Sequence, residues 1–279
     1  MSRLLAAYLL LSGLALAGPH RPGTWPLLAL AHVALAAVAL RAADSARDGG
    51  VVRAWLVALL PLLVMPLLYA ELPLLNQAVW GGRYFDETII TAERALFGFE
   101  PARELARMRD EAWISEPLHA AYISYYLIIY APPLLIGWKR GTAAMREAVF
   151  TLALVFFAHY LFFVWFPVEG PRYRFETPVT EDARGAAYQL AHALLEAGSS
   201  RGAAFPSSHV GVSVAATIVT WRHLRALAPL IGVLTVGLAF GAVYGGFHYG
   251  IDALAGALLG GALATLAPRL RSMLEAGRA

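Results

Sequence analysis

Long apolar runs separated by short charged stretches make up most of the chain. A helix needs about 20 predominantly apolar residues to cross a bilayer, and several runs approach or reach this length. The expected membrane-spanning segments are residues 4–18, 24–41, 51–70, 113–137, 144–166, 206–222, 228–247 and 249–267. The pattern therefore predicts an all-α fold, a polytopic transmembrane helical bundle of about eight spans with short interfacial helices.

The first apolar run has two interpretations. Residues 4–18 are few for a span, and Arg3 followed by a leucine run also resembles a cleavable signal peptide. We favour a retained span because a membrane protein does not need cleavage in order to insert.

The composition agrees with membrane insertion. Of the 279 residues, 59% are hydrophobic and 15% are charged, whereas a soluble domain is about 45–50% apolar and about 25% charged. The chain has no cysteine, which excludes disulfides, thiolate catalysis and cysteine-ligated metals. Its basic residues form no long block, so nothing supports nucleic-acid binding.

The distribution of charge predicts the orientation. Lys and Arg concentrate in short cytoplasmic loops. Suppose that the N-terminus, the loops 41–53, 138–147 and 221–227, and the tail lie on one side of the membrane. That side then has many basic residues and few acidic ones. The basic residues are Arg3, Arg41, Arg47, Arg53, Lys139, Arg140, Arg146, Arg222, Arg225, Arg269, Arg271 and Arg278, and the acidic residues are Asp44, Asp48, Glu147 and Glu275. We therefore expect the protein to lie in the cell inner membrane with both termini in the cytoplasm. The connections 71–112 and 167–205 are then expected on the periplasmic side.

A charged and apolar mixture at residues 85–109 interrupts the spans. Gly98 and Pro101 suggest a break between two short helices. Such amphipathic pieces usually lie in the plane of the membrane interface. A surface cover over the bundle is the simpler interpretation, and a lid or lipid-entry role is the alternative.

One candidate site lies at residues 205–211, Phe-Pro-Ser-Ser-His-Val-Gly, where an apolar run begins. Proline and serine are favoured where a helix starts, and the unpaired amides at that end suit a phosphate group. Ser207 and Ser208 can add hydroxyl donors, and His209 can supply a proton. An ordinary helix cap beside an interfacial histidine is the alternative.

A second histidine begins the last apolar run. Asp252 follows His248 by four residues, so both side chains share one helix face. An aspartate inside a span costs about 2.5–3.5 kcal/mol unless it is paired or solvated. A hydrogen bond to it would fix the histidine tautomer and leave the other ring nitrogen free to attack or to bind a metal. A structural pair is the alternative.

Phosphate also requires a cation. Arg172 lies in a Gly-Pro-Arg turn directly after a span, and its planar guanidinium matches phosphate oxygens. Arg174 and Arg201 are weaker candidates. Each could instead contact lipid headgroups.

Taken in order, these motifs resemble those of the type 2 phosphatidic acid phosphatase (PAP2) superfamily. Gly-Pro-Arg ends at Arg172, Phe-Pro-Ser-Ser-His ends at His209, and His-Tyr-Gly-Ile-Asp spans 248–252. Within the superfamily, the chain is most similar to the inositol phosphorylceramide synthase and sphingomyelin synthase branch. The resemblance covers roughly residues 113–267, with Leu96-Phe97-Gly98 and Pro101 before them, and implies a six-helix core.

The resemblance implies a role for each candidate. His248 would take the phosphoryl group as a phosphohistidine, Asp252 would orient it, and His209 would protonate the leaving oxygen and later act as a base. Arg172, Ser207 and Ser208 would bind the phosphate, and no metal or other cofactor is implied. The expected partners are a membrane phospholipid or sphingolipid and an acceptor, either water or an alcohol such as inositol.

Two positions depart from the superfamily pattern. A lysine usually precedes the motif arginine by seven residues, and Trp165 stands there. A Ser-Arg pair usually precedes the third-motif histidine, and Gly241-Ala242 stands in its place. Two phosphate-binding cations are thus missing from their expected positions.

With the resemblance, the chain divides into four parts. We expect N-terminal transmembrane helices at 1–70, an interfacial connection at 71–112, a catalytic transmembrane core at 113–267 and a cytoplasmic tail at 268–279. His32, His119 and His159 are interpreted as packing or inter-helix hydrogen-bonding groups. An aromatic stripe at Tyr122, Tyr125, Tyr126 and Tyr130 fits packing or the shaping of a headgroup pocket.

Several functions remain open on the sequence. The first is a lipid phosphotransferase, and the second is a simple phosphatase of phosphatidate or prenyl pyrophosphate. A proton-coupled transporter is a different class, but it gives no reason for Pro-Ser-Ser-His at a helix start. A serine protease using Ser207 or Ser208 with His248 lacks the glycine-flanked nucleophile of such enzymes.

Overall fold

The computed structural model describes residues 2–45, 50–106, 112–175 and 184–276, and within them the chain is helical apart from loops and one isolated β-bridge. The helices are α1 (Ser2–Gly13), η1 (Leu14–Ala17), α2 (Trp25–Ser45), α3 (Val51–Trp80), α4 (Asp86–Phe97), α5 (Pro101–Ala106), α6 (Ala112–Ile123), α7 (Tyr125–Arg140), α8 (Thr142–Trp165), η2 (Pro171–Tyr173), α9 (Ala186–Gly198), α10 (Ser208–His223), α11 (Ala228–Tyr244) and α12 (Gly250–Ala276). The expected all-α class is confirmed.

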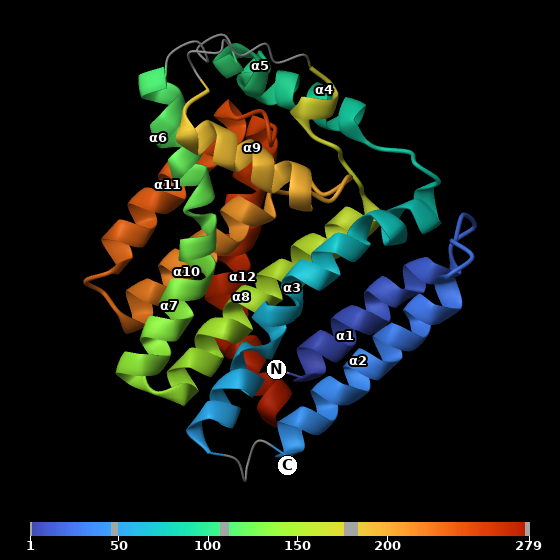
Figure 1. The fold of residues 1–279 in the computed structure, drawn as a ribbon, viewed down its shortest axis with the longest axis vertical. Coiled ribbons are helices and arrows are strands. Elements are labelled where there is room, and N and C mark those ends of the chain that lie inside the picture. The colour runs from blue at the N-terminus through green and yellow to red at the C-terminus, as the bar shows by residue number, and fades with distance from the viewer. Residues whose placement is uncertain (1, 46–49, 107–111, 176–183, 277–279) are drawn as a thin grey trace.

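Helix α8 forms the centre of the bundle. It is apolar on every face and mostly buried, as expected of a helix enclosed by others. Its neighbours are α1, α3, α7, α10 and α12. Helices α1 and α2 pair at one edge, while α4, α5 and α9 lie across one end of the molecule (Figure 1).

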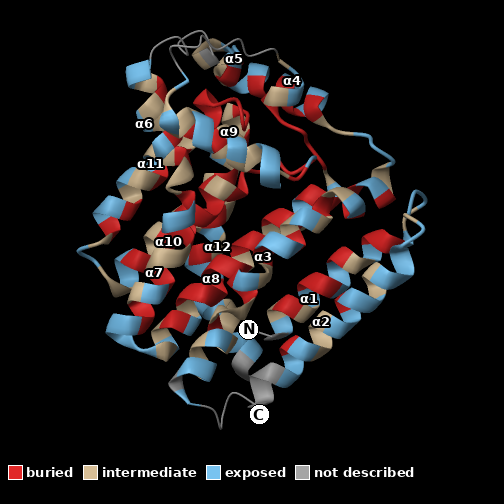
Figure 2. Cartoon of the chain, viewed as in Figure 1, coloured by how far each residue is buried: buried red, intermediate tan, exposed pale blue. Residues whose placement is uncertain are grey.

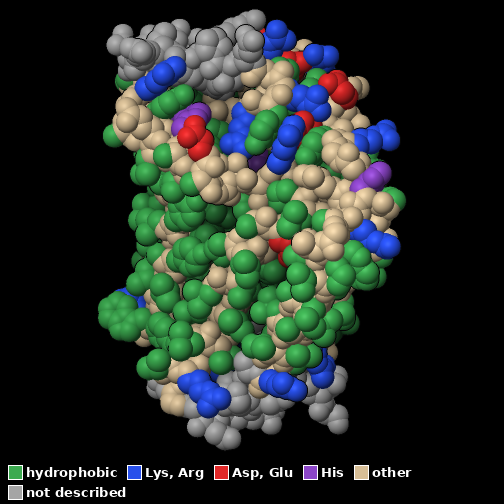
Figure 3. Space-filling model, turned by 45° about the vertical axis from the view of Figure 1, so that its right-hand side comes forward, with side chains coloured by type: hydrophobic (Ala, Val, Ile, Leu, Met, Phe, Trp, Pro, Cys, Tyr) green, Lys and Arg blue, Asp and Glu red, His purple; other side chains and the backbone are tan. Residues whose placement is uncertain are grey.

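Three helices of the described chain are long and apolar enough to cross a membrane, by length and composition: Val52–Trp80, Thr142–Trp165 and Gly250–Leu274. Helices α6 and α7, joined at a 40° bend, make a fourth if they count as one span. Hydrophobic side chains cover the middle of the face in Figure 3, and charged ones gather toward its two ends. The bundle therefore has the surface of a membrane protein, while the expected count of about eight spans is not confirmed.

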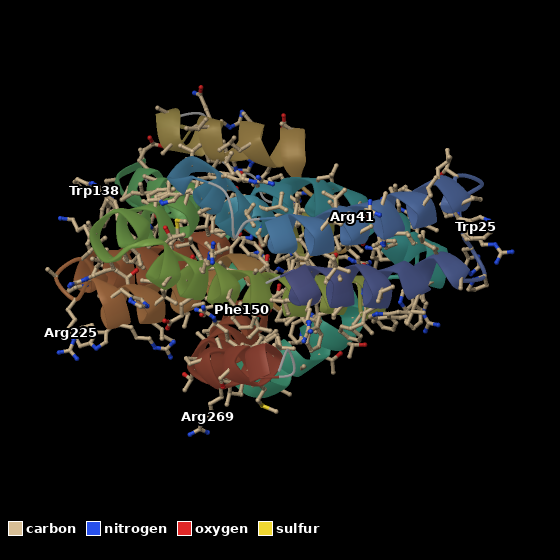
Figure 4. All side chains as sticks on the ribbon, turned by 90° about the horizontal axis from the view of Figure 1, so that it is seen from below. Trp25, Arg41, Trp138, Phe150, Arg225 and Arg269 are labelled. Carbon is tan, nitrogen blue, oxygen red and sulfur yellow. The ribbon has the colours of Figure 1, made fainter. Side chains whose placement is uncertain are left out.

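Seen from below in Figure 4, Phe150 of α8 lies among the helices, and Arg225 and Arg269 point outward from them. Phe150 is buried, in keeping with the central place of α8. Phe150 thus belongs to the interior of the bundle, and these two arginines lie at its periphery.

The structure differs from the expected boundaries in three places. Helix α3 continues to Trp80, so the connection expected to start at residue 71 begins inside a helix. The expected span 113–137 breaks at Ser124, whose hydroxyl donates to the Ala121 carbonyl and competes with the helical hydrogen bonds. Helix α12 continues to Ala276, so most of the expected tail is helical.

Some of the sequence predictions lie outside the described residues. These are residues 46–49 of the first basic loop, 107–111 and 176–183 of the two long connections, and 277–279 of the tail.

Helix α4 confirms the break expected in the interfacial segment. It ends at Phe97, Gly98 adopts a left-handed conformation with φ of 77°, and α5 starts at Pro101. Its buried face consists of Asp86, Ile89, Ile90 and Glu93, and in Figure 2 this buried side of α4 adjoins the bundle. The helix therefore buries two carboxylates along with its apolar residues.

Candidate functional site

Three loops meet at the end of the bundle that α4 and α9 cover. The Val168 amide donates to the Gly202 carbonyl at 3.1 Å, and the Ala204 amide donates to the Val168 carbonyl at 2.9 Å. The Arg172 amide donates to the Gly246 carbonyl at 3.1 Å. Backbone hydrogen bonds thus join the loops that carry the three sequence motifs.

Close packing of α10 against α12 brings two of these motifs together. A Cβ atom at Gly256 would lie 2.3 Å from the Ser207 carbonyl oxygen, and one at Gly260 would lie 2.1 Å from the Gly211 carbonyl oxygen. Real Cβ atoms essentially never approach so closely. Glycine at these positions lets the helix of His209 approach the helix that follows His248.

Ser207 caps α10, as its position in the sequence predicted. Its Oγ accepts from the Val210 amide at 3.4 Å, and its own amide donates to the Asp252 carbonyl at 3.0 Å. Ser208 is also buried, and it lines a cavity together with His209. The start of α10 is therefore tied to the start of α12.

The structure brings His209 and His248 together. The Nδ1 atom of His209 lies 3.4 Å from the Nε2 atom of His248, and the ring centroids are 5.5 Å apart. The hydroxyl of Tyr122 lies 3.4 Å from the other nitrogen of His209, Nε2. Two histidines that are 39 residues apart in sequence thus share one site.

A backbone carbonyl, in addition to Asp252, faces the outer nitrogen of His248. Nδ1 lies 3.0 Å from the Ala204 carbonyl oxygen and 3.5 Å from Asp252 Oδ2. Both neighbours only accept, so Nδ1 carries the proton and the lone pair of a neutral ring resides on Nε2. Asp252 Oδ2 also accepts from the Tyr249 amide at 2.8 Å, which caps α12.

Arg172 lines the same small cavity as His209 and His248, a space of about 30 Å³. Its Nη2 donates to Tyr173 Oη and to Ser199 Oγ, both at 2.6 Å. These contacts hold the guanidinium beside the cavity.

The two weaker arginine candidates pair with a carboxylate. Arg201 Nε donates to Glu169 Oε1 at 2.5 Å, and Arg174 Nη2 lies 3.3 Å from Glu169 Oε2. Neither is among the described residues that line the small cavity, whereas Arg172 is.

The structure explains one of the two missing motif cations. A Cβ atom at Gly241 would lie 2.3 Å from the Leu118 carbonyl oxygen, and Ala242 is fully buried. Where the superfamily pattern has Ser-Arg, this chain thus has two small residues that allow close contact between α11 and α6. Trp165, at the position of the missing lysine, is 42% exposed at the end of α8.

A larger cavity of about 270 Å³ adjoins the small one, and His209 lines both. Its walls come from α3, α6, α7, α8, α9 and the start of α10 and are mostly apolar and aromatic. All four tyrosines of the predicted stripe line this cavity: Tyr122, Tyr125, Tyr126 and Tyr130. Tyr69 and Tyr160 line it as well. The site thus has a polar part and an apolar part.

His119 and His159 lie in contacts of a structural kind. The Nδ1 atom of His119 lies 2.7 Å from the Ser115 carbonyl oxygen, and that of His159 lies 2.7 Å from the Val155 carbonyl oxygen. Both acceptors are one helical turn earlier. The described residues contain no group of three or more His, Asp or Glu side chains placed to hold a metal ion.

The sequence interpretation missed the two buried carboxylates of α4. Asp86 accepts from the Gly170 amide, and Glu93 accepts from the Ile251 amide, so both reach motif-bearing segments. Their spacing of seven residues places them on one helix face with Ile89 and Ile90. The sequence feature that could have revealed them is an acidic pair on the apolar face of an amphipathic helix.

Comparison with known families gives one match. The family described as the PAP2 superfamily matches residues 87–266, which is more than half of the chain. No match was found among curated proteins or among solved structures. The matched range starts in α4 and includes all three motifs.

Proposed function

The chain belongs to the PAP2 superfamily of phosphatase-type enzymes, and we propose that it is an integral-membrane enzyme that cleaves a lipid phosphoester through a phosphohistidine. One observation carries this proposal: His209, His248 and Arg172 line a single cavity. Two imidazoles and a guanidinium are the groups that a metal-independent phosphoryl transfer needs for attack, proton transfer and charge stabilisation.

In the first step, Nε2 of His248 attacks phosphorus. The P–N bond forms, the bond between phosphorus and the leaving oxygen breaks, and His209 gives that oxygen a proton. Arg172 binds the non-bridging oxygens, with the Ser207–Ser208 helix start beside them. The proton on Nδ1 of His248 stays between the ring and its two acceptors, Ala204 and Asp252, which stabilise the positive imidazole.

In the second step, the acceptor oxygen attacks the phosphohistidine. His209, now neutral, takes the acceptor proton, the new P–O bond forms, and the P–N bond to His248 breaks. Water as acceptor releases a phosphate, whereas an alcohol receives the phosphoryl or headgroup-phosphate. The enzyme returns to its starting protonation state in both cases.

The larger cavity supports a lipid as the substrate. It is lined mostly by apolar and aromatic side chains and adjoins the polar cavity at His209 and Tyr122. An apolar cavity can receive an alkyl chain from the bilayer without exposing it to water. We propose that the chain of the lipid occupies this cavity while its phosphate lies against Arg172.

For the acceptor, we propose an alcohol such as inositol, following the resemblance to the inositol phosphorylceramide and sphingomyelin synthases. Hydrolysis of phosphatidate or prenyl pyrophosphate is the alternative with the same residues. We also propose that the site faces the periplasm. Both termini and the α7–α8 loop lie toward the end of the bundle opposite α4, α5 and α9 (Figure 1), and basic residues of that loop favour a cytoplasmic place.

The test is turnover of phospholipid labelled in its phosphate, by the purified protein in lipid nanodiscs with and without inositol. Transfer predicts a labelled inositol product that appears only when inositol is present. Release of inorganic phosphate alone in both mixtures would leave the phosphatase and remove the transferase. A His248→Ala variant that keeps the wild-type rate would remove the nucleophile.

A further inference from the structure

Asp86 is a fully buried carboxylate that lies beside the site without lining either cavity. It is the first residue of α4. Its Oδ1 accepts from the Gly170 amide and from the Tyr249 hydroxyl, both at 2.9 Å. Its Oδ2 accepts from the Glu169 amide at 3.0 Å.

The partners of Asp86 belong to two segments that carry proposed catalytic groups. Gly170 lies two residues before Arg172, which binds the phosphate, and Tyr249 directly follows His248, which attacks it. Oδ1 receives a hydrogen bond from each segment at a single oxygen atom. This carboxylate therefore connects the two segments at a second point, in addition to the backbone hydrogen bond from the Arg172 amide to the Gly246 carbonyl.

Hydrogen-bond donors and a guanidinium surround the Asp86 carboxylate. Burying a charge is costly unless it is hydrogen-bonded and paired. Asp86 receives three hydrogen bonds, and the guanidinium of Arg174 lies 3.6 Å from Oδ2. Because both connecting hydrogen bonds end at Oδ1, the carbonyl oxygen of an asparagine would still accept them, whereas an alanine would remove both.

We propose that Asp86 is a positioning residue that fixes the guanidinium of Arg172 relative to the imidazole of His248, acting through Gly170 and Tyr249. The proposal rests on the proposed function, because it takes those two groups as the phosphate clamp and the nucleophile. A displacement of about 1 Å between catalytic groups can lower a rate about 10²-fold. One buried aspartate on an interfacial helix would then control the rate without touching the substrate.

The first test is a double-mutant cycle. Asp86→Ala is expected to lower kcat/KM for the lipid phosphate about 10²-fold per folded protein. In an Arg172→Ala background, where there is no guanidinium to position, the same change is expected to cost less than about threefold. Equal losses in both backgrounds mean that Asp86 only supports folding, and they overturn the proposal.

Two further variants guard against loss of the fold. Tyr249→Phe removes the hydroxyl that donates a hydrogen bond to Asp86 and leaves the carboxylate in place. We therefore expect a smaller loss of kcat/KM, with the same dependence on Arg172. Glu87→Gln is the matched control, because Glu87 is exposed in the same turn of α4. It is expected to behave as wild type.

The second test does not need activity. Amide hydrogen exchange is measured in residues 167–175 and 245–249 of the wild type, Asp86→Ala and Glu87→Gln. Faster exchange in both segments of Asp86→Ala alone supports the connection, and unchanged exchange overturns it. If the wild type turns over no lipid phosphate, the proposed function fails, and this measurement still decides whether Asp86 holds the two segments.

Discussion

In the described chain, His32 and His248 are buried histidines that each face a carboxylate, and they differ in what the ring can do. In the N-terminal helices, His32 Nε2 lies 2.8 Å from Glu71 Oε1, and His32 Nδ1 lies 3.0 Å from the Leu9 carbonyl oxygen. At the site, His248 Nδ1 lies between a carbonyl and Asp252. Both pairs satisfy the rule that a buried polar group needs a partner.

The difference lies in the second ring nitrogen. Both nitrogens of His32 face oxygen acceptors within 3.0 Å, so the ring has no lone pair to offer. Nε2 of His248 instead faces His209 beside a cavity that Arg172 also lines. A histidine–carboxylate pair inside an apolar bundle is therefore insufficient evidence of chemistry. A ring nitrogen that keeps its lone pair beside a cation and a cavity is the informative feature.

The comparison is tested most strongly by substituting the two histidines alike. His248→Asn is expected to lower kcat on the order of 10⁴-fold or more, since it removes the nucleophile. His32→Asn is expected to keep the wild-type kcat per folded protein. Initial rates on a lipid phosphate, normalised to the monodisperse fraction from gel filtration, measure both. Equal losses from the two substitutions would remove the distinction.

The second prediction concerns His209, which lies beside Nε2 of His248. His209→Asn is expected to lower kcat about 10²–10⁴-fold with a lipid alcohol as leaving group, because no acid protonates the departing oxygen. With an alkyl nitrophenyl phosphate the loss should shrink, because nitrophenolate leaves without a proton. A loss that is the same for both substrates contradicts a role as acid.

The cation beside the cavity gives the third prediction. Arg172→Ala is expected to lower kcat about 10²–10³-fold, because it removes donors aimed at the charge of the transition state. Arg201→Gln is the matched control, since its guanidinium pairs with Glu169. Comparable rate losses in the two variants would mean that Arg172 has no special place in phosphate binding.

The N-terminal pair gives the fourth prediction, which concerns stability. Glu71→Ala leaves His32 without its carboxylate, and breaking a buried pair costs about 3–5 kcal/mol. We expect a lower melting temperature in nanodiscs with an unchanged kcat for the folded fraction. A melting temperature equal to that of the wild type would show that the pair contributes nothing to the fold.

Local patterns made part of the site predictable. Pro-Ser-Ser-His at a helix start and a histidine four residues before an aspartate are readable from spacing alone, and so is the break of α4 at Gly98. The Ala204 carbonyl beside His248 comes from a loop 44 residues away. No local pattern encodes such a contact, because it depends on how the three loops pair.

The fold was predictable to a similar depth. Apolar runs identified the helices, but their ends depend on tertiary contacts, as the continuation of α3 to Trp80 illustrates. The acidic residues of α4 were visible in the sequence, and their spacing was not used. Asp86 and Glu93 fall at the first and last positions of an i, i+3, i+4, i+7 stripe, which is the buried face of α4. The prediction of an amphipathic helix was therefore correct but incomplete, because two acidic residues lie on the buried face.

Glu93 provides the last and smallest prediction, because its carboxylate is buried without a histidine. Burial raises the pKa of Glu93 from 4.5 to about 7, and the Ile251 amide at 3.2 Å only partly offsets this. The folded state therefore holds a proton that the unfolded state has lost between pH 4.5 and about 7, so stability falls as pH rises through that window. Glu93→Gln removes the titration and is expected to flatten the melting temperature against pH there, relative to the wild type and to Glu87→Gln. If melting temperature changes with pH in the same way in all three proteins, Glu93 is ionised in the folded state at acidic pH. A buried carboxylate of α4 would then keep its charge without a histidine beside it.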